Sequence, residues 1–182
     1  MILHSPTGSL FQRYPLYSVD ASAMYWLTLH MPSDVAPSLW ALVAEWADEG
    51  RLLISDEIKR ETETLDEWKD FFRERPRMVV SLAEMGEYFK AFQNEATVHN
   101  IQLTRPNSTR DQGDPFVVAL ALMLEKRSLA NLRDRTDPEA ICRVVTYENK
   151  GPGRKKIPDA CQFYDIRYMR WAQVLKEEGR SI

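Results

Sequence analysis

The chain has 182 residues, of which 44% are hydrophobic and 28% are charged, with a formal net charge of −3. This length and composition exclude an intrinsically disordered protein and predict a single globular domain over residues 1–182. The small negative charge gives no support to a general polyanion-binding protein, although catalytic acids would themselves contribute to it.

No apolar run is long enough to span a bilayer, and residues 1–15 lack the apolar centre of a signal peptide. We therefore expect a cytoplasmic protein without a membrane partner, with a short arm at 1–15 and a core at 16–178. Cys142 and Cys161 are too few for a disulfide framework, and each is expected to be a small buried residue.

Strand-like and helix-like segments alternate along the chain. The expected strands are short and apolar, and they cover residues 16–19, 51–55, 77–80, 141–146 and 166–169. The expected helices have apolar residues three or four positions apart, and they cover residues 21–30, 38–49, 56–72, 81–97, 114–124, 157–161 and 171–178. This alternation predicts an α/β fold, a three-layer α/β/α sandwich with a central, mostly parallel sheet.

Acidic residues follow two of the expected strands. Asp20 comes directly after the first strand, and Glu148 follows Thr146 at the end of the strand 141–146. Right-handed crossovers bring the carboxyl ends of parallel strands to one edge of a sheet, where α/β proteins bind ligands. We therefore expect Asp20 and Glu148 at the same edge. The simpler alternative is that Asp20 or Ser22 only caps the next helix.

A third acid stands at the start of the most apolar helix. Asp114 precedes Pro115, which suits the first position of a helix, and nearly every residue of 116–124 is apolar. Asp114 is thus expected at the mouth of a buried helix, with Asp111 one turn earlier. From this stretch alone, an ordinary N-cap is the simpler explanation of Asp114.

Glu61 is a fourth candidate, because it shares one helical face with Ile58, Leu65 and Trp68. An acid on such a stripe either reaches a site or lies at the edge of the core.

Clustered carboxylates repel one another, and proteins keep such clusters where they bind divalent cations. Oxygen ligands alone favour Mg²⁺ or Mn²⁺ over zinc. The histidines His4, His30 and His99 are scattered without metal-ligand spacing.

The order of these motifs resembles the PIN domain, the ribonuclease fold of the VapC-type toxins of toxin–antitoxin pairs. The segments that carry the resemblance are Asp20–Ser22, Ile58–Glu61, Gly113–Ala121 and Val144–Glu148. Residues 37–40 and 156–161 and the polar loop before Asp114 are similar to one bacterial PIN-like branch. The resemblance extends over residues 16–178.

The resemblance implies a metal-dependent endoribonuclease that hydrolyses RNA phosphodiester bonds with bound Mg²⁺ or Mn²⁺. The residues that match the catalytic, metal-binding acids are Asp20, Glu61, Asp114 and Glu148, although the last acid of the family is usually Asp. Ser22 and Thr146 match accessory hydroxyls. Asp111 is an additional acid, and the sequence does not indicate whether it faces the site.

Partners follow from the same resemblance. An antitoxin protein is expected to cover the site, and proteins of this family often pair as homodimers. The Trp-bearing helix at 38–46 is either the interface of such a homodimer or part of the core. Lys155 and Lys156 are hypothetical phosphate contacts, with a solvated charged loop as the alternative.

Two other classes of function stay open. One is a PIN-like module that binds a partner without cleaving RNA. The other is a Mg²⁺-dependent phosphohydrolase of small molecules, but that class often has a second Asp at the place of Ser22.

Overall fold

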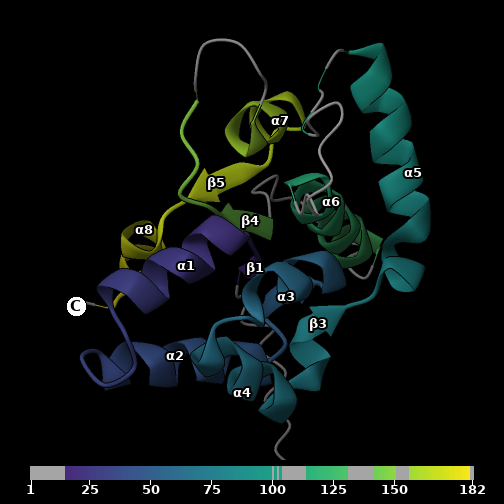
Figure 1. Ribbon diagram of the computed structural model, residues 1–182. Helices are drawn as coiled ribbons and strands as arrows, with labels where there is room; N and C mark the ends of the chain where they lie inside the picture. The colour runs from purple at the N-terminus through teal and green to yellow at the C-terminus, as the bar shows by residue number, and fades with distance from the viewer. Residues whose placement is uncertain are drawn as a thin grey trace, which may run out of the picture.

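The computed structural model describes residues 15–99, 101, 103, 114–130, 142–150 and 156–180, with the backbone alone for residues 127–130. Five parallel strands form its central sheet in the order β3-β2-β1-β4-β5 (Figure 1). The strands are β1 (Leu16–Val19), β2 (Leu52–Ser55), β3 (Val79–Val80), β4 (Cys142–Val145) and β5 (Arg167–Met169).

Helices cover both faces of this sheet, which confirms the expected three-layer fold (Figure 1). They are α1 (Ala21–His30), α2 (Pro37–Asp48), α3 (Asp56–Thr62), α4 (Asp66–Glu74), the 3₁₀ turn η1 (Pro76–Met78), α5 (Leu82–Val98), α6 (Asp114–Ala130), α7 (Ile157–Phe163) and α8 (Trp171–Glu177). With right-handed crossovers, this strand order puts α1–α4 on one face and α5–α7 on the other. The Trp171 indole donates to Ala23 O at 2.9 Å, so α8 lies beside α1.

The pairing register brings the ends of the central strands together. β1 pairs with β2 on one side and with β4 on the other, and Val19 lies opposite Val145. Because both faces of the sheet are covered, β1, β2 and β4 are buried almost throughout. The residues that follow β1 and β4 therefore meet at one edge.

Several boundaries differ from expectation: α6 continues to Ala130 rather than ending at 124, and the expected strand 77–80 is only β3, preceded by η1. The expected helix 56–72 is two helices, α3 and α4. The Thr62 hydroxyl bonds back to Ile58 O at 2.8 Å, and Leu65 N donates to Thr62 O at 3.0 Å, so the chain turns before α4 begins. α2 begins at Pro37 rather than after Ser38, because proline suits the first turn of a helix.

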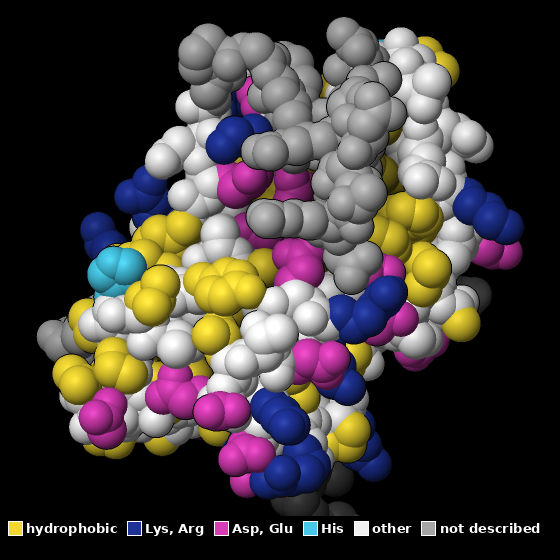
Figure 2. Space-filling model, in the orientation of Figure 1, with side chains coloured by type: hydrophobic (Ala, Val, Ile, Leu, Met, Phe, Trp, Pro, Cys, Tyr) yellow, Lys and Arg dark blue, Asp and Glu magenta, His cyan; other side chains and the backbone are white. Residues whose placement is uncertain are grey.

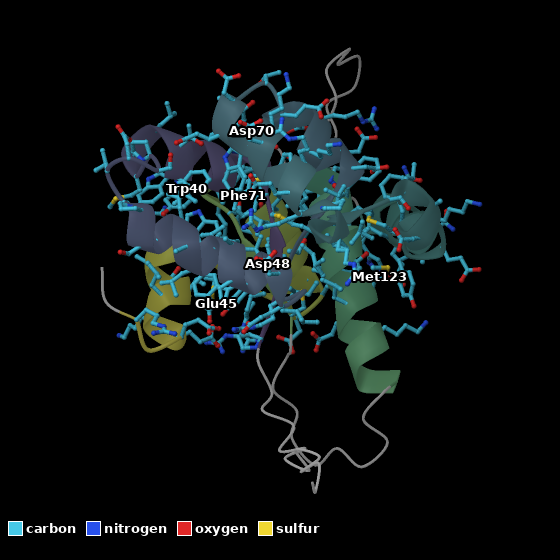
Figure 3. All side chains as sticks on the ribbon, turned by 90° about the horizontal axis from the view of Figure 1, so that it is seen from below. Trp40, Glu45, Asp48, Asp70, Phe71 and Met123 are labelled. Carbon is cyan, nitrogen blue, oxygen red and sulfur yellow. The ribbon has the colours of Figure 1, made fainter. Side chains whose placement is uncertain are left out.

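The apolar face of α2 belongs to the core. Trp40 and Trp46 are 8% and 2% exposed. The Trp40 ring lies 4.8 Å from that of Trp68 and 6.1 Å from that of Phe71, which joins α2 to α4 (Figure 3). This face is therefore packed inside the protein, and a homodimer would need another surface.

A buried polar network ties the end of the chain to the amino-terminal edge of the sheet. The Tyr17 hydroxyl donates to Glu178 at 2.6 Å, and Arg51 pairs with the same carboxylate. Arg143, which is 4% exposed, pairs with Glu177 at 2.9 Å. These contacts anchor α8 at the edge opposite Asp20. In the described part of the chain, no helix has the length and apolar character that a membrane crossing requires.

Candidate functional site

Asp20 is held at the carboxyl end of the central strand. Its backbone N–H donates to Val145 O at 2.9 Å, which extends the β1–β4 ladder by one residue before α1 begins. Its side chain is 3% exposed and, in the described structure, makes no capping hydrogen bond to the first turn of α1. Although burial raises the pKa of this carboxyl, the backbone N–H of Ser22, in the first turn of α1, helps to lower it, so a helix-cap role accompanies the side-chain contacts of Asp20.

Two hydroxyl groups orient the Asp20 carboxylate. Ser22 Oγ and Thr146 Oγ1 both donate to Oδ2, the second at 2.9 Å. Each hydroxyl also accepts a backbone N–H: Tyr147 donates to Ser22 Oγ at 2.9 Å, and Glu148 donates to Thr146 Oγ1 at 3.0 Å. An ionised carboxylate can only accept, so in that state both hydroxyls donate to Asp20, and the two hydroxyl oxygens themselves lie 3.3 Å apart.

The environment of Asp20 opposes its ionisation. Burial raises the pKa of its carboxyl above the ordinary value of 3.8, the hydrogen bonds from Ser22 and Thr146 lower the pKa, and the nearby charge of Glu148 raises it. The net direction is upward. An ionised Asp20 thus destabilises the fold at neutral pH, and a bound cation would offset that cost. Carboxylates of this kind are concentrated at functional sites.

Glu148 lies beside this centre, in the segment that follows β4. Its Oε2 accepts the backbone N–H of Ile157 at 3.1 Å, at the start of α7. Lys156 Nζ lies 3.9 Å from its Oε1. Of the two lysines expected to contact phosphate, Lys156 is therefore an ion-pair partner of an acid at the site. Lys155 and Asp111 lie outside the described residues.

Asp114 and Glu61 belong to α6 and α3, which pack against β1 and α1. Ser18 Oγ donates to Val117 O at 2.9 Å, which puts the first turn of α6 beside the end of β1. The Tyr25 hydroxyl donates to Glu61 O at 2.7 Å, which joins α3 to α1. Both acids are half-buried. Figure 2 shows acidic side chains gathered in the middle of this face, beside an apolar area.

These acids do not form a completed metal site. Among the described residues, no three His, Cys, Asp or Glu side chains form a group that could hold a metal ion as they stand. The donor set nevertheless suits Mg²⁺ or Mn²⁺ in kind, because the groups that converge at this edge are carboxylate and hydroxyl oxygens. The raised pKa of Asp20 is a second sign of fit, since a cation would stabilise the ionised form.

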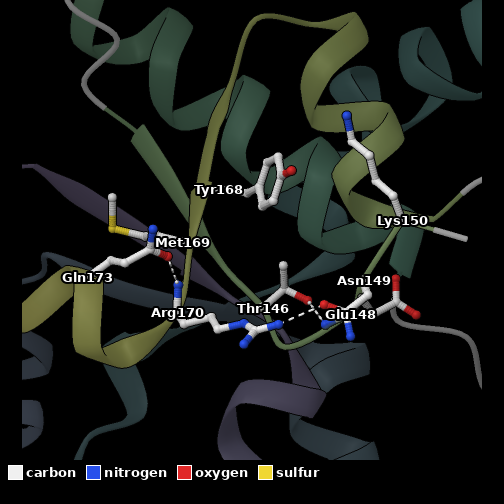
Figure 4. Close-up of a pocket in the computed structure, with 8 residues that line it drawn as sticks. All are labelled: Thr146, Glu148, Asn149, Lys150, Tyr168, Met169, Arg170 and Gln173. Carbon is white, nitrogen blue, oxygen red and sulfur yellow. Dashed lines mark hydrogen bonds between the residues drawn. The ribbon is translucent and has the colours of Figure 1, made fainter.

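The structure adds residues that the sequence did not single out. Tyr147 stacks on Trp26 with ring centroids 4.6 Å apart, and the Arg170 guanidinium lies 5.5 Å from the Tyr147 ring. Arg170 and Tyr168 also line a hollow of about 300 Å³ next to Glu148 (Figure 4). Arg170 directly follows β5. Like Asp20 after β1, it therefore lies at the edge formed by the carboxyl ends of the parallel strands, where α/β proteins bind ligands.

The two cysteines fit a structural role. Both are free and buried, and burial raises the pKa of each thiol, that of Cys161 to about 12. Thiols of this kind stay protonated at neutral pH and are poor nucleophiles. The expectation that Cys142 and Cys161 are small buried residues is confirmed.

Comparisons with known proteins assign the chain to one family. No curated protein and no solved structure matches it. The segment that matches a family model, residues 17–132, contains Asp20, Glu61 and Asp114 and ends before Thr146 and Glu148. The model is described as a domain of unknown function (DUF4411), and because it covers more than half of the chain, the protein belongs to this family.

Proposed function

We propose that the chain is a metal-dependent endoribonuclease that hydrolyses RNA phosphodiester bonds at Asp20. One observation carries the proposal: a buried carboxylate at the carboxyl edge of a parallel sheet is held by two hydroxyl groups beside a second acid. Carboxylates whose pKa is shifted by burial and by a second acid are concentrated at functional sites. The resemblance to PIN domains supports RNA as the substrate and the role of a toxin with an antitoxin partner.

The residues of the site would have two roles, to orient the Asp20 carboxylate and to bind a cation. Ser22 and Thr146 keep the Asp20 carboxylate in one orientation through Oδ2. A divalent cation, Mg²⁺ or Mn²⁺, held by Asp20 and Glu148 with further oxygen ligands from Asp114, Glu61 or water, would lower the pKa of a bound water and stabilise the leaving oxygen.

Lys156 supplies positive charge beside the acids. Its ion pair with Glu148 offsets part of the repulsion between an acidic site and a polyanionic substrate. We propose it as a phosphate contact, which orients the RNA backbone without reading its sequence. Lys156→Ala should weaken RNA binding to a similar extent for all sequences.

The test is cleavage of a panel of tRNA and single-stranded RNA with Mg²⁺, Mn²⁺ or EDTA. Wild-type protein should cut at least one RNA in a metal-dependent way, and Asp20→Asn should not. Asp34→Asn is the matched control, because Asp34 is an exposed acid outside the site. Cleavage that persists in EDTA or in Asp20→Asn would contradict the proposal.

The toxin role needs a separate test. Induced expression of the wild-type chain in a bacterial host should arrest growth, whereas Asp20→Asn should not. If both proteins leave growth unchanged while cleavage is seen in vitro, the nuclease assignment stands and the toxin role is wrong.

A binding module without nuclease activity is the second candidate. It is favoured by the lack of a group of three acids arranged as a metal site among the described residues. A thermal melt separates the two functions. If the protein is a metal-dependent nuclease, millimolar Mn²⁺ should raise its melting temperature. If it is a binding module without nuclease activity, Mn²⁺ should leave the melting temperature unchanged.

A further inference from the structure

A hollow extends the acidic site towards the edge strand β5. It has a volume of about 300 Å³, and its wall includes Thr146 and Glu148 on one side and Tyr168 and Arg170 on the other (Figure 4). The hollow therefore shares two residues with the surroundings of Asp20. A ligand within it would lie next to the carboxylates.

Hydrogen bonds within the wall determine which amide atoms of Asn149 and Gln173 face Arg170. Asn149 Oδ1 accepts from Arg170 Nη2 at 2.7 Å, and Gln173 Oε1 accepts from the Arg170 backbone N–H at 2.9 Å. Because both Arg170 groups can only donate, the amide oxygens are the atoms that face Arg170. Each amide then has its NH₂ group left as a donor. Lys150, another wall residue, adds a positive charge, and its Nζ donates to Gln162 of α7.

An aromatic ring and a well-positioned cation complete the wall. Tyr168 is 41% exposed, so its ring is accessible to a ligand in the hollow. The Arg170 guanidinium is held by Asn149 and by the Tyr147 ring, which itself stacks on Trp26. This support keeps Arg170 in place before any ligand arrives, which reduces the entropy lost on binding.

We propose that this hollow binds one nucleotide of a single-stranded RNA, next to the phosphodiester bond that the acidic site cleaves. The Tyr168 ring stacks on the base, Lys150 and Arg170 bind phosphate oxygens, and the amides of Asn149 and Gln173 donate to acceptors on the base edge. A base can enter only if it is unstacked, so the hollow selects single strands over duplexes. The inference rests on the proposed nuclease function.

Binding is measured without cleavage. The experiment uses the full chain with Asp20→Asn, EDTA and a fluorescent single-stranded RNA of about eight nucleotides, with anisotropy as the signal. In that background, Tyr168→Ala should lower affinity about 5- to 100-fold, as the loss of one base–aromatic stack does. Tyr168→Phe should retain most of the affinity because it keeps the ring. Phe163→Ala is the matched control, since Phe163 is a 46% exposed ring outside the hollow.

Each outcome either supports or overturns the nucleotide site, and the results distinguish its failure from a failure of the nuclease proposal. If Tyr168→Ala and Phe163→Ala bind equally well, the hollow is not a nucleotide site, even where wild-type protein cleaves RNA. If Tyr168→Ala alone weakens binding but wild-type protein never cleaves, the hollow is supported and the nuclease proposal is wrong. If no RNA binds, or if a duplex binds as tightly as a single strand, the inference is overturned.

Discussion

Replacing Asp20 by Asn should stabilise the protein while abolishing its activity. The amide has the shape of the carboxyl group, and its oxygen can still accept the hydroxyl protons of Ser22 and Thr146. The change removes a charge whose pKa burial raises. Every pKa unit by which the native value exceeds the unfolded one corresponds to about 1.4 kcal/mol of lost stability at high pH. In a domain of this size, 1 kcal/mol shifts the melting temperature by about 2–4 °C.

The stability difference between Asp20→Asn and wild type should change with pH in a defined direction. A carboxyl with a raised native pKa holds its proton more tightly when folded, so its contribution makes the wild-type protein less stable as pH rises from about 3.8 through the native pKa. The melting temperature of Asp20→Asn relative to wild type should therefore grow over that window and stay constant above it. Asp34→Asn should show no such trend. A variant that melts below wild type at pH 7, or by a margin independent of pH, would refute the reasoning.

Three further predictions concern the hydroxyls, the buried network and two glycines. Thr146→Val should lower cleavage about 10- to 100-fold and move the acid limb of its pH profile to higher pH, because a hydrogen bond that lowers the pKa of Asp20 is lost; an unchanged profile would contradict this. Glu178→Ala should lower the free energy of unfolding in urea by about 1–3 kcal/mol, because the Tyr17 hydroxyl loses its acceptor and Arg51 loses one carboxylate while it keeps its ion pair with Glu49; an unchanged free energy of unfolding would contradict the network. Gly50→Ala should cost about 1 kcal/mol in the same assay, since Gly50 has a φ of +71° and open space around a Cβ, whereas Gly86→Ala within α5 should be neutral or stabilising.

The parts of the site that lie at strand ends were predictable from the sequence. Asp20 and Glu148 follow short apolar runs, and the topology of a parallel sheet puts such positions at one edge. Arg170 also follows a strand, β5, but a cation at this position is not typical of an acidic metal site, so the sequence pattern did not indicate it. The stack of Tyr147 on Trp26 had no local signal, since it depends on how α1 packs against the segment after β4.

The break between α3 and α4 shows where periodicity misleads. Ile58 and Trp68 keep a helical spacing in the sequence, and both are buried. The chain nevertheless turns after Thr62, whose hydroxyl bonds back to Ile58 O. Spacing reports which side chains face the core, and it is the same for one helix as for two helices joined by a short turn.

The support of Asp20 by Thr146 also bears on the order of events during synthesis. The two residues are 126 positions apart, and the hydroxyl of Thr146 reaches the carboxylate only once β4 has paired with β1. A nascent chain that ends before β4 contains Asp20 without Thr146, Tyr147 or Glu148. We therefore expect a growing chain to be inactive until β4 and the segment that follows it have left the ribosome and β4 has paired with β1.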